Sequence, residues 1–377
     1  MSLPIDNVDA QTAAMSLDDD AAPSSHEVEP SSGPRNSKGW DGKLRIPKTA
    51  TLANPEALSD PEYSDDENIL DGEEIEPDED LLDDEDPDTD EIMCAHSRIK
   101  SIPSLRLERF QKVVRICLRQ NNIQDIEGLA VLASTLEDVD LYDNLIAHIR
   151  GLDELTKLTV LDLSFNKIKH IKNIGHMHDL QTLFLVANKI SKIEGLEGLT
   201  KLTSLELGSN RIREIRNLES LTNLEELWVA KNKITEIEGL GKLSNLRLLS
   251  IQSNRITDLS PLQSVPSLEE LYISHNALTS LDGLQANSKL RVLDISNNRI
   301  SSLKGLGPLK TLEELWASYN HIADFADVER ELKDKEELTT VYFEGNPLQL
   351  RSPALYRNKV RLALPQVSQI DATFVRV

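Results

Sequence analysis

The chain has 377 residues, of which 28% are charged and 4% aromatic, with a net charge of −23 at pH 7 and two cysteines. Such an acidic chain lacks the basic surface that nucleic-acid binding needs, and no apolar run reaches the roughly 18 residues of a membrane-spanning helix. Two cysteines are too few for a disulfide framework. We therefore expect no nucleic-acid or membrane partner, and a protein with reduced thiols in the nucleus and cytoplasm.

The first predicted element is an acidic tail over residues 1–91, rich in Pro, Ser, Asp and Glu. Nineteen acidic residues and no Lys or Arg fall between Asp60 and Glu91, so the rest of the chain is close to neutral. Such a composition buries too little apolar surface to offset the entropy of ordering, which predicts disorder. The tail is either a solubilising segment or a regulatory arm. Ser64 precedes three acidic residues, a context that favours phosphorylation by acidophilic kinases.

A leucine-rich unit then repeats over residues 92–350, most clearly in Leu224–Leu243. Each copy has an asparagine, position n, with apolar residues at n−8, n−5, n−3, n+2, n+5 and n+8. Successive asparagines are 22 residues apart, except for a first step of 23 and a last step of 26. The asparagines are Asn121, Asn144, Asn166, Asn188, Asn210, Asn232, Asn254, Asn276, Asn298, Asn320 and Asn346. This period predicts an α/β fold, a leucine-rich-repeat solenoid with a curved parallel sheet.

The spacing within one unit explains this fold. Positions n−5 and n−3 point to the same side of a short strand. Positions n+2, n+5 and n+8 are three apart, which suits 3₁₀-like turns on the convex side. Stacked copies share one continuous core, which a single copy cannot form. We predict a structural role for the asparagines, because their amides can satisfy backbone groups where the strand turns inward.

Both ends of the array depart from the repeat. Ile92–Leu105 reads as a degenerate first unit with Ser97 in place of the asparagine, as expected for a terminal repeat. A four-residue insertion near the other end predicts a short charged helix within Asp327–Glu337. Residues 351–377 form a predicted C-terminal cap, in which Ser352–Leu364 is an amphipathic helix over the last core layer.

The strand positions n−6, n−4 and n−2 should face away from the core, onto the concave side of the sheet. Five of the eleven residues at n−4 are aromatic in a chain that is 4% aromatic, and three repeats carry Glu at n−6. Duplication of a two-repeat unit explains their 44-residue period, but not why exposed aromatics and carboxylates were retained. Exposed aromatics favour binding hot spots, and the acidic columns favour a basic partner with apolar hollows. The predicted partner-binding residues are Asp140, Asp162, Phe184, Glu206, Glu226, Trp228, Glu270, Tyr272, Asp294, Glu314, Trp316 and Tyr342.

No sequence motif indicates an enzyme. There is no Gly-rich phosphate loop, dinucleotide fingerprint or nucleophile elbow. His170, His176 and His178 lie close together, but no Cys or carboxylate completes a metal-ligand set at a familiar spacing, so we expect surface histidines. Asp140 and Asp162 are expected to form ion pairs rather than an acid–base pair. The sequence therefore predicts no catalytic residue, metal or cofactor.

Eleven repeats of this length, the words LEELW and LEELY, and a cap containing Tyr356 and Asp371 resemble one family over residues 92–377. It is that of the 22-residue leucine-rich-repeat regulatory subunits of protein phosphatase 1. The resemblance implies a non-catalytic chain, monomeric on its own, that binds the phosphatase catalytic subunit through its concave face. It implies control of the subunit's maturation, activity and localisation, and of mitotic exit, in some cases holding it in an inactive, metal-deficient state with a third inhibitor protein. The contact residues that it implies are Asp162, Phe184, Glu206, Trp228, Asp294, Glu314, Trp316 and Tyr342.

One departure concerns how phosphatase regulators dock. Many use a short peptide in which a basic residue and Val or Ile precede Phe or Trp, and no Phe or Trp of this chain has that context. Binding must then come from the folded solenoid rather than from a docking peptide. The alternative is a leucine-rich scaffold for another partner, such as a splicing or tubulin-handling complex, although the basic concave stripe that would favour splicing is absent.

Overall fold

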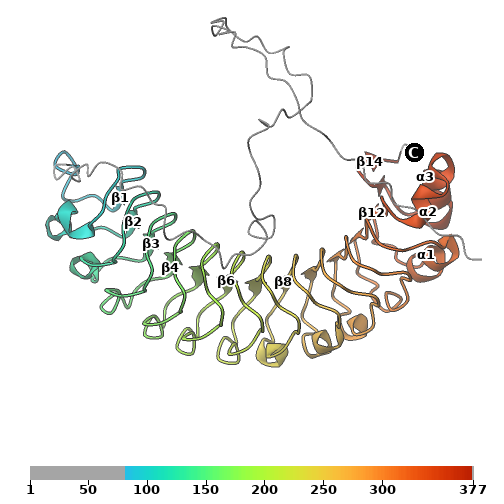
Figure 1. The fold of residues 1–377 in the computed structure, drawn as a ribbon, viewed down its shortest axis with the longest axis horizontal. Coiled ribbons are helices and arrows are strands. Elements are labelled where there is room, and N and C mark those ends of the chain that lie inside the picture. The colour runs from blue at the N-terminus through green and yellow to red at the C-terminus, as the bar shows by residue number, and fades with distance from the viewer. Residues whose placement is uncertain (1–80, 376–377) are drawn as a thin grey trace, which may run out of the picture. The chain divides into compact units, whose positions relative to one another are not determined.

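The computed structural model describes residues 81–375, which form a curved stack of short strands (Figure 1). The predicted disordered tail up to residue 80, including Ser64, lies outside the described residues. None of the helices within 81–375 has the length and hydropathy needed to cross a bilayer.

The described strands form one sheet of fourteen strands, ordered as they occur in the sequence. Each neighbouring pair from β1 to β13 is parallel, and only β13 and β14 are antiparallel. The strands are β1 Glu91–Met93, β2 Arg115–Cys117, β3 Asp138–Asp140, β4 Val160–Asp162, β5 Thr182–Phe184, β6 Ser204–Glu206, β7 Glu226–Trp228, β8 Leu248–Ser250, β9 Glu270–Tyr272, β10 Val292–Asp294, β11 Glu314–Trp316, β12 Thr340–Tyr342, β13 Gln369–Ile370 and β14 Thr373–Phe374. The predicted leucine-rich solenoid is confirmed.

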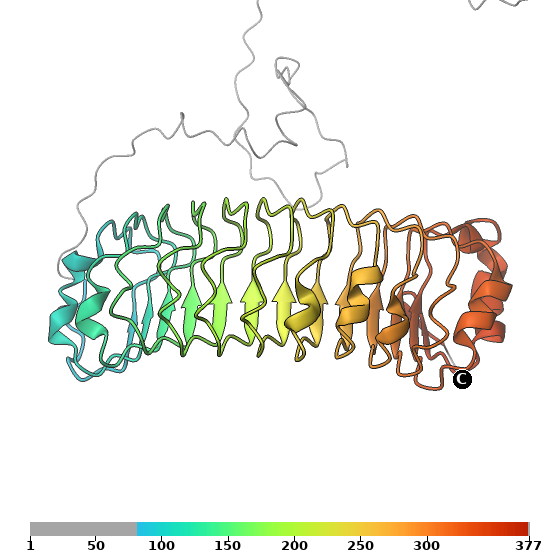
Figure 2. The ribbon, with the colours of Figure 1, turned by 90° about the horizontal axis from the view of Figure 1, so that it is seen from below.

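Short helices lie on the return path of the chain, and several of them are seen from the convex side in Figure 2. The 3₁₀ helices are η1 Ile102–Leu105, η2 Leu107–Arg109, η3 Leu129–Leu132, η4 Leu240–Lys242, η5 Ser260–Ser264 and η6 Leu284–Ala286. Three α-helices follow near the C-terminus: α1 Phe325–Leu332, α2 Pro347–Leu350 and α3 Pro353–Ala363. The three-residue spacing of apolar positions thus produces the tight turns that it predicted.

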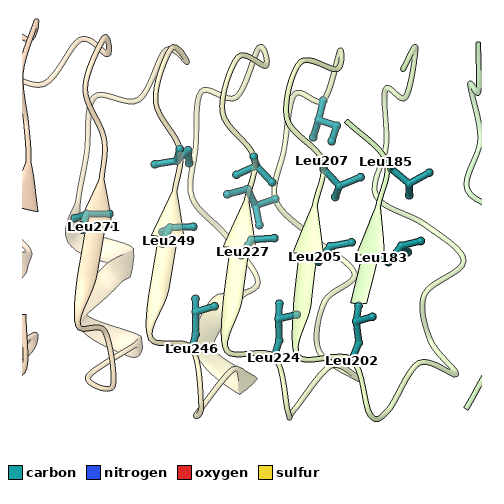
Figure 3. Close-up of a cluster of buried hydrophobic side chains, with 14 of the residues drawn as sticks. Leu183, Leu185, Leu202, Leu205, Leu207, Leu224, Leu227, Leu246, Leu249 and Leu271 are labelled. Atoms are coloured by element: carbon teal, nitrogen blue, oxygen red, sulfur yellow. The ribbon is translucent and has the colours of Figure 1, made fainter. Parts of the chain in front are cut away.

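The core is a set of leucine and isoleucine columns running through the stack (Figure 3). Parallel pairing places Leu205 beside Leu227 and Leu227 beside Leu249, and all three side chains are fully buried. Burying one such side chain stabilises the fold by about 1.5–3 kcal/mol. Every repeat therefore depends on the repeats on either side of it.

The asparagine column forms the predicted ladder. Asn232 Nδ2 donates to Leu207 O at 2.9 Å and to Val229 O at 3.1 Å, while its Oδ1 accepts from Ile212 N at 2.9 Å. One side chain thereby satisfies backbone groups of two consecutive repeats at the point where the strand ends. The other asparagines of the column make equivalent bonds, for example Asn298 with Ile273 O and Leu278 N. Their structural role is confirmed.

The N-terminal end packs earlier than predicted. Strand β1 pairs with β2 and forms the degenerate first unit as expected. However, Leu82 is 3% exposed and belongs to the core, and Asp83 pairs with Arg109 at 2.9 Å. The boundary between tail and solenoid at residue 91 was therefore too late, because an apolar residue within the acidic run covers the open end of the first repeat.

The C-terminal end contains the predicted cap and a helix at the insertion. That helix, α1, covers Phe325–Leu332 and so begins and ends earlier than the predicted range of Asp327–Glu337. Asp324 caps α1 by accepting a hydrogen bond from Ala326 N at 2.9 Å. Tyr356 of α3 donates its hydroxyl to Asp371 Oδ2 at 2.9 Å, and Asp371 Oδ1 accepts from Phe343 N, also at 2.9 Å. The cap therefore takes over the backbone groups that a further repeat would satisfy.

Candidate partner-binding face

Four of the five aromatic residues of the n−4 column form a contiguous ring stack toward the C-terminal end of the sheet. The ring centroids are 6.5 Å apart for Trp228 and Tyr272, 6.2 Å for Tyr272 and Trp316, and 5.9 Å for Trp316 and Tyr342. Aromatic pairs at these distances contribute about 0.5–1.5 kcal/mol beyond their buried area. We call these four residues the ring stack; it offers a preformed apolar surface.

The aromatics of the ring stack are less exposed than predicted. Trp228, Tyr272 and Trp316 are half-buried, because they lie on every second strand and lean toward each other over small residues. Ser250 and Asp294, on the strands between them, are 2% and 7% exposed. Adjacent strands are only about 4.8 Å apart, so alternation of large and small side chains lets the rings pack. The 44-residue period of the sequence therefore places the large rings on alternate strands, where they have room to pack.

A glutamate two residues before each of the first three rings orients that ring. Glu226 accepts from the Trp228 indole at 3.3 Å, and Glu314 accepts from the Trp316 indole at 3.1 Å. In the repeat between them, the Tyr272 hydroxyl donates to the neighbouring glutamate at n−6 at 2.7 Å. Burial, and then this hydrogen bond, raise the pKa of Tyr272, which stays protonated at neutral pH. The LEELW and LEELY words thus encode a ring with its carboxylate.

The two glutamates in each word have different electrostatic surroundings. The first, at n−7, pairs with an arginine: Glu269 with Arg247 at 2.9 Å and Glu313 with Arg291 at 2.8 Å. The second, at n−6, makes no ion pair among residues 81–375. The n−6 residues are Glu226, Glu270 and Glu314. Carboxylates without a close ion pair therefore accompany the ring stack, as a basic partner would require.

The N-terminal part of the predicted face differs from the expectation. Asp140 and Asp162 are 3% and 9% exposed, and both form ion pairs with Arg119. Each carboxylate also accepts a backbone hydrogen bond, from Tyr142 N and Ser164 N respectively. Short side chains on adjacent strands are covered by their neighbours, so these two aspartates, like Asp294, are buried rather than available. The predicted ion pairing is confirmed, but its partner, Arg119 at n−2, was missed.

Two further aromatic residues beside this arginine were also missed. The Tyr142 and Phe165 ring centroids are 4.8 Å apart, and the Arg119 guanidinium lies 5.2 Å from the centre of the Tyr142 ring. Phe165 remains 45% exposed. These residues occupy n−2 and n−1, outside the n−4 column that first indicated a binding surface.

The remaining predicted residues lie between these two groups. Phe184 on β5 and Glu206 on β6 are half-buried on the concave side. Burial, followed by the charges of Asp162 and Glu226, raises the pKa of Glu206. The centre of the face is therefore a region where negative charge accumulates.

The three histidines have separate partners rather than a common centre. His170 Nδ1 lies 2.9 Å from Glu194, His176 Nε2 lies 3.0 Å from Leu152 O, and His178 Nδ1 lies 2.9 Å from Gly198 O. Across the described range, 81–375, no group of His, Cys, Asp and Glu has a metal-binding arrangement.

Comparison with protein families supports the repeat assignment. The model described as "Leucine Rich repeats (2 copies)" matches residues 156–198, 178–221, 200–242, 222–264, 244–286, 266–308 and 288–330. An internalin from Listeria monocytogenes has a similar fold, with a TM-score of 0.59 and 26% identity over 76% of this chain and 87% of its own. A leucine-rich-repeat protein of Leptospira interrogans has a TM-score of 0.57 and 23% identity over 70% and 73% of the two chains, which shows the fold alone.

Several proteins with similar sequences are named as regulatory subunits of protein phosphatase 1. Protein phosphatase 1 regulatory subunit SDS22 of Saccharomyces cerevisiae is 49% identical over 92 residues, which are 24% of this chain and 27% of that protein. The Schizosaccharomyces pombe protein of the same name is 59% identical over 54 residues, 14% and 16% of the two chains. Human protein phosphatase 1 regulatory subunit 7 is 65% identical over 46 residues, 12% of each chain.

These matches span 27% or less of the relatives' lengths, and they agree with the resemblance drawn from the repeats and the cap. The chain is a leucine-rich-repeat protein that, over the matched segments, is similar to regulatory subunits of protein phosphatase 1.

Proposed function

We propose that the chain is a non-enzymatic regulatory subunit that binds the catalytic subunit of protein phosphatase 1 through its concave face. The observation that carries the proposal is the ring stack together with the glutamates at n−6, which orient the rings and form no ion pair with another described residue. The names of the similar proteins supply the partner, and the repeat fold is that of a binding scaffold rather than an enzyme.

The surface has the properties of an interface hot spot. Trp and Tyr are enriched among residues that dominate binding energy, and the rings are already held by each other and by their glutamates. Tyr342 is also held from the cap, because Gln369 donates to its hydroxyl at 2.8 Å. Preformed side chains lose little rotamer entropy on binding, which favours affinity. The stack extends from β7 to β12, five strand steps or roughly 24 Å, enough for the centre of a protein interface.

The proposal includes finer points that the resemblance implies. The chain controls maturation, activity and localisation of the catalytic subunit in nucleus and cytoplasm, with a bearing on mitotic exit. It acts as a monomer that forms the complex, in some cases together with a third inhibitor protein.

Calorimetry of the full chain with the purified catalytic subunit, both metal-loaded and metal-stripped, tests the proposal. We expect binding that Trp316→Ala weakens by about 2 kcal/mol or more, as for a hot-spot aromatic. The array should remain folded, with a melting temperature lowered only by the loss of its two ring contacts. Tyr319→Ala is the matched control, since Tyr319 is an exposed aromatic of the same repeat outside the ring stack. No binding heat with either form of the subunit would reject the phosphatase and favour the alternative, a scaffold for another basic partner.

A further inference from the structure

A cationic groove lies on the return path between the repeats of Asn144 and Asn166, outside the concave face. Its volume is about 400 Å³. Its polar lining consists of His148, Arg150, Lys169, His170, Lys172 and Asn173, with the apolar Ala147 and Ile149 and no Asp or Glu. We call it the cationic groove. This size is within the range of ligand pockets, about 300–1,000 Å³.

The backbone beneath the groove is fixed. Position n+7 adopts a left-handed conformation in most repeats and is usually glycine, as at Gly151 with φ of 74° and Gly195 with φ of 71°. Between these two repeats the residue is Asn173, with φ of 59°. Its amide donates to Ile149 O at 2.8 Å and so ties the two walls together. Ile149 itself is buried in the core.

The three cationic side chains of the groove are confined to these two repeats and form no ion pair with another described residue. Arg150, Lys169 and Lys172 are all exposed. At the n+6 position of Arg150 and Lys172, the flanking repeats carry the acids Glu127 and Glu194. Three cations therefore converge in a short segment of a chain whose net charge is −23.

The same positions carry an internal ion pair in another repeat. In the repeat of Asn210, Glu214 at n+4 pairs with Arg216 at n+6. In the cationic groove, position n+4 is occupied instead by His148 and His170, which are hydrogen-bond donors or acceptors without a negative charge. Of these, His170 Nδ1 lies 2.9 Å from Glu194 Oε1, a residue of the next repeat that does not line the groove. The groove lining thus lacks the internal counter-charge that the repeat of Asn210 has.

We propose that the cationic groove binds the phosphate of a phosphorylated segment of a protein partner. A phosphoserine or phosphothreonine carries a charge of about −1.5 to −2 at pH 7 and three strong acceptor oxygens. The Arg150 guanidinium can bind two of these oxygens as a planar fork, and the two lysines add rotatable donors. The groove is open and has no aromatic wall for a nucleobase, which suits a side chain presented by an extended peptide. The proposal is independent of the proposed function and leaves the concave face free.

Fluorescence anisotropy of the full chain with a labelled, otherwise neutral peptide carrying one phosphoserine tests this site. We expect the phosphopeptide to bind at least about tenfold more tightly than its unphosphorylated form, because charge-assisted hydrogen bonds to phosphate are lost without it. Arg150→Gln combined with Lys172→Gln should reduce that binding by about tenfold or more. Lys304→Gln is the matched control, since Lys304 occupies the same n+6 position, exposed, in a distant repeat. It should have no effect.

Four outcomes would overturn the proposal. They are the absence of phosphopeptide binding, an equal loss with Lys304→Gln, equal affinity for a peptide with Asp in place of phosphoserine, and inorganic phosphate binding as tightly as the peptide. The third would indicate a general acidic-peptide surface, and the fourth a site for the free ion. Thermal melts of the double variant show whether it is folded. If it is not, the comparison of phosphorylated and unphosphorylated peptide binding to the wild-type chain still tests the proposal.

Discussion

Removing one amide from the asparagine ladder should unfold the array locally at two repeats. Asn232→Ala deletes the donor to Leu207 O and Val229 O and the acceptor for Ile212 N. Only Ile212 N is then left without a partner, at a cost of about 1–3 kcal/mol, because Asn210 and Asn254 still donate to the two carbonyl oxygens. Each of the two lost bonds to those oxygens costs about a further 0.5–1.5 kcal/mol. Water entering the small space left by the amide recovers part of this, so we expect a loss of about 2–5 kcal/mol in the free energy of unfolding.

Hydrogen exchange tests the reasoning more sharply than a melting temperature. The Ile212 amide should lose most of its protection, and the repeats at both ends of the array should keep theirs, because each repeat contacts only its neighbours. Asn232→Asp serves as the matched variant, since it keeps the acceptor for Ile212 N but places a carboxylate against two carbonyl oxygens, and it should be at least as destabilising. A loss below about 0.5 kcal/mol for Asn232→Ala, or unchanged protection of Ile212, would refute the structural role of the ladder.

Three further predictions concern the core, the turns and the concave charge. Leu315→Ala should destabilise the array by about 2–5 kcal/mol in denaturant unfolding, because Leu315 is fully buried, and a smaller loss would contradict tight packing there. Gly151→Ala should strongly lower the melting temperature, because φ is +74° and the new Cβ would be 1.9 Å from Ile126 O; an unchanged melt would argue against this turn. Burial raises the pKa of Glu206, so its ionisation destabilises the fold as pH rises through that pKa. Glu206→Gln should therefore raise the melting temperature at pH 7 but not at acid pH. A lower melting temperature at pH 7 would show that the ionised Glu206 stabilises the fold, which contradicts this prediction.

The fold could be predicted almost completely from the sequence, because eleven copies of one pattern repeat the same constraint. A buried apolar position and a buried asparagine recur at fixed spacing, and each recurrence reduces the ambiguity of a single short strand. The cap was recognisable because Tyr356, Val360 and Leu364 are four apart, as on one face of a helix. The burial of Leu82 in the core could not be predicted, since the acidic residues around it indicated a solvated tail.

The concave face was predicted only in part. Alternation assigns a side of the sheet correctly, but exposure depends on the size of the neighbours on adjacent strands, about 4.8 Å away. The aspartates at Asp140 and Asp162 are covered, whereas the longer Glu226 reaches solvent. Arg119 was missed because it is the only basic residue in the n−2 column, so only the structure shows that it pairs with both aspartates.

The ring stack explains why carboxylates persist at n−6. Each one orients a ring, yet it makes no close ion pair among residues 81–375, unlike the glutamate before it. Glutamates that served only stability would gain from pairing, as their n−7 neighbours do with Arg247 and Arg291. We infer that their counter-charge comes from the partner.

The most direct test of this claim compares two triple variants in binding to the phosphatase catalytic subunit. One removes the n−6 charges, with Glu226, Glu270 and Glu314 each changed to Gln. The other removes the same number of n−7 charges one residue away, with Glu225, Glu269 and Glu313 each changed to Gln. The proposed docking face predicts that the n−6 variant binds at least about a hundredfold more weakly by calorimetry, and that the n−7 variant binds within about threefold of wild type. Equal losses in the two variants, or none in the first, would contradict it.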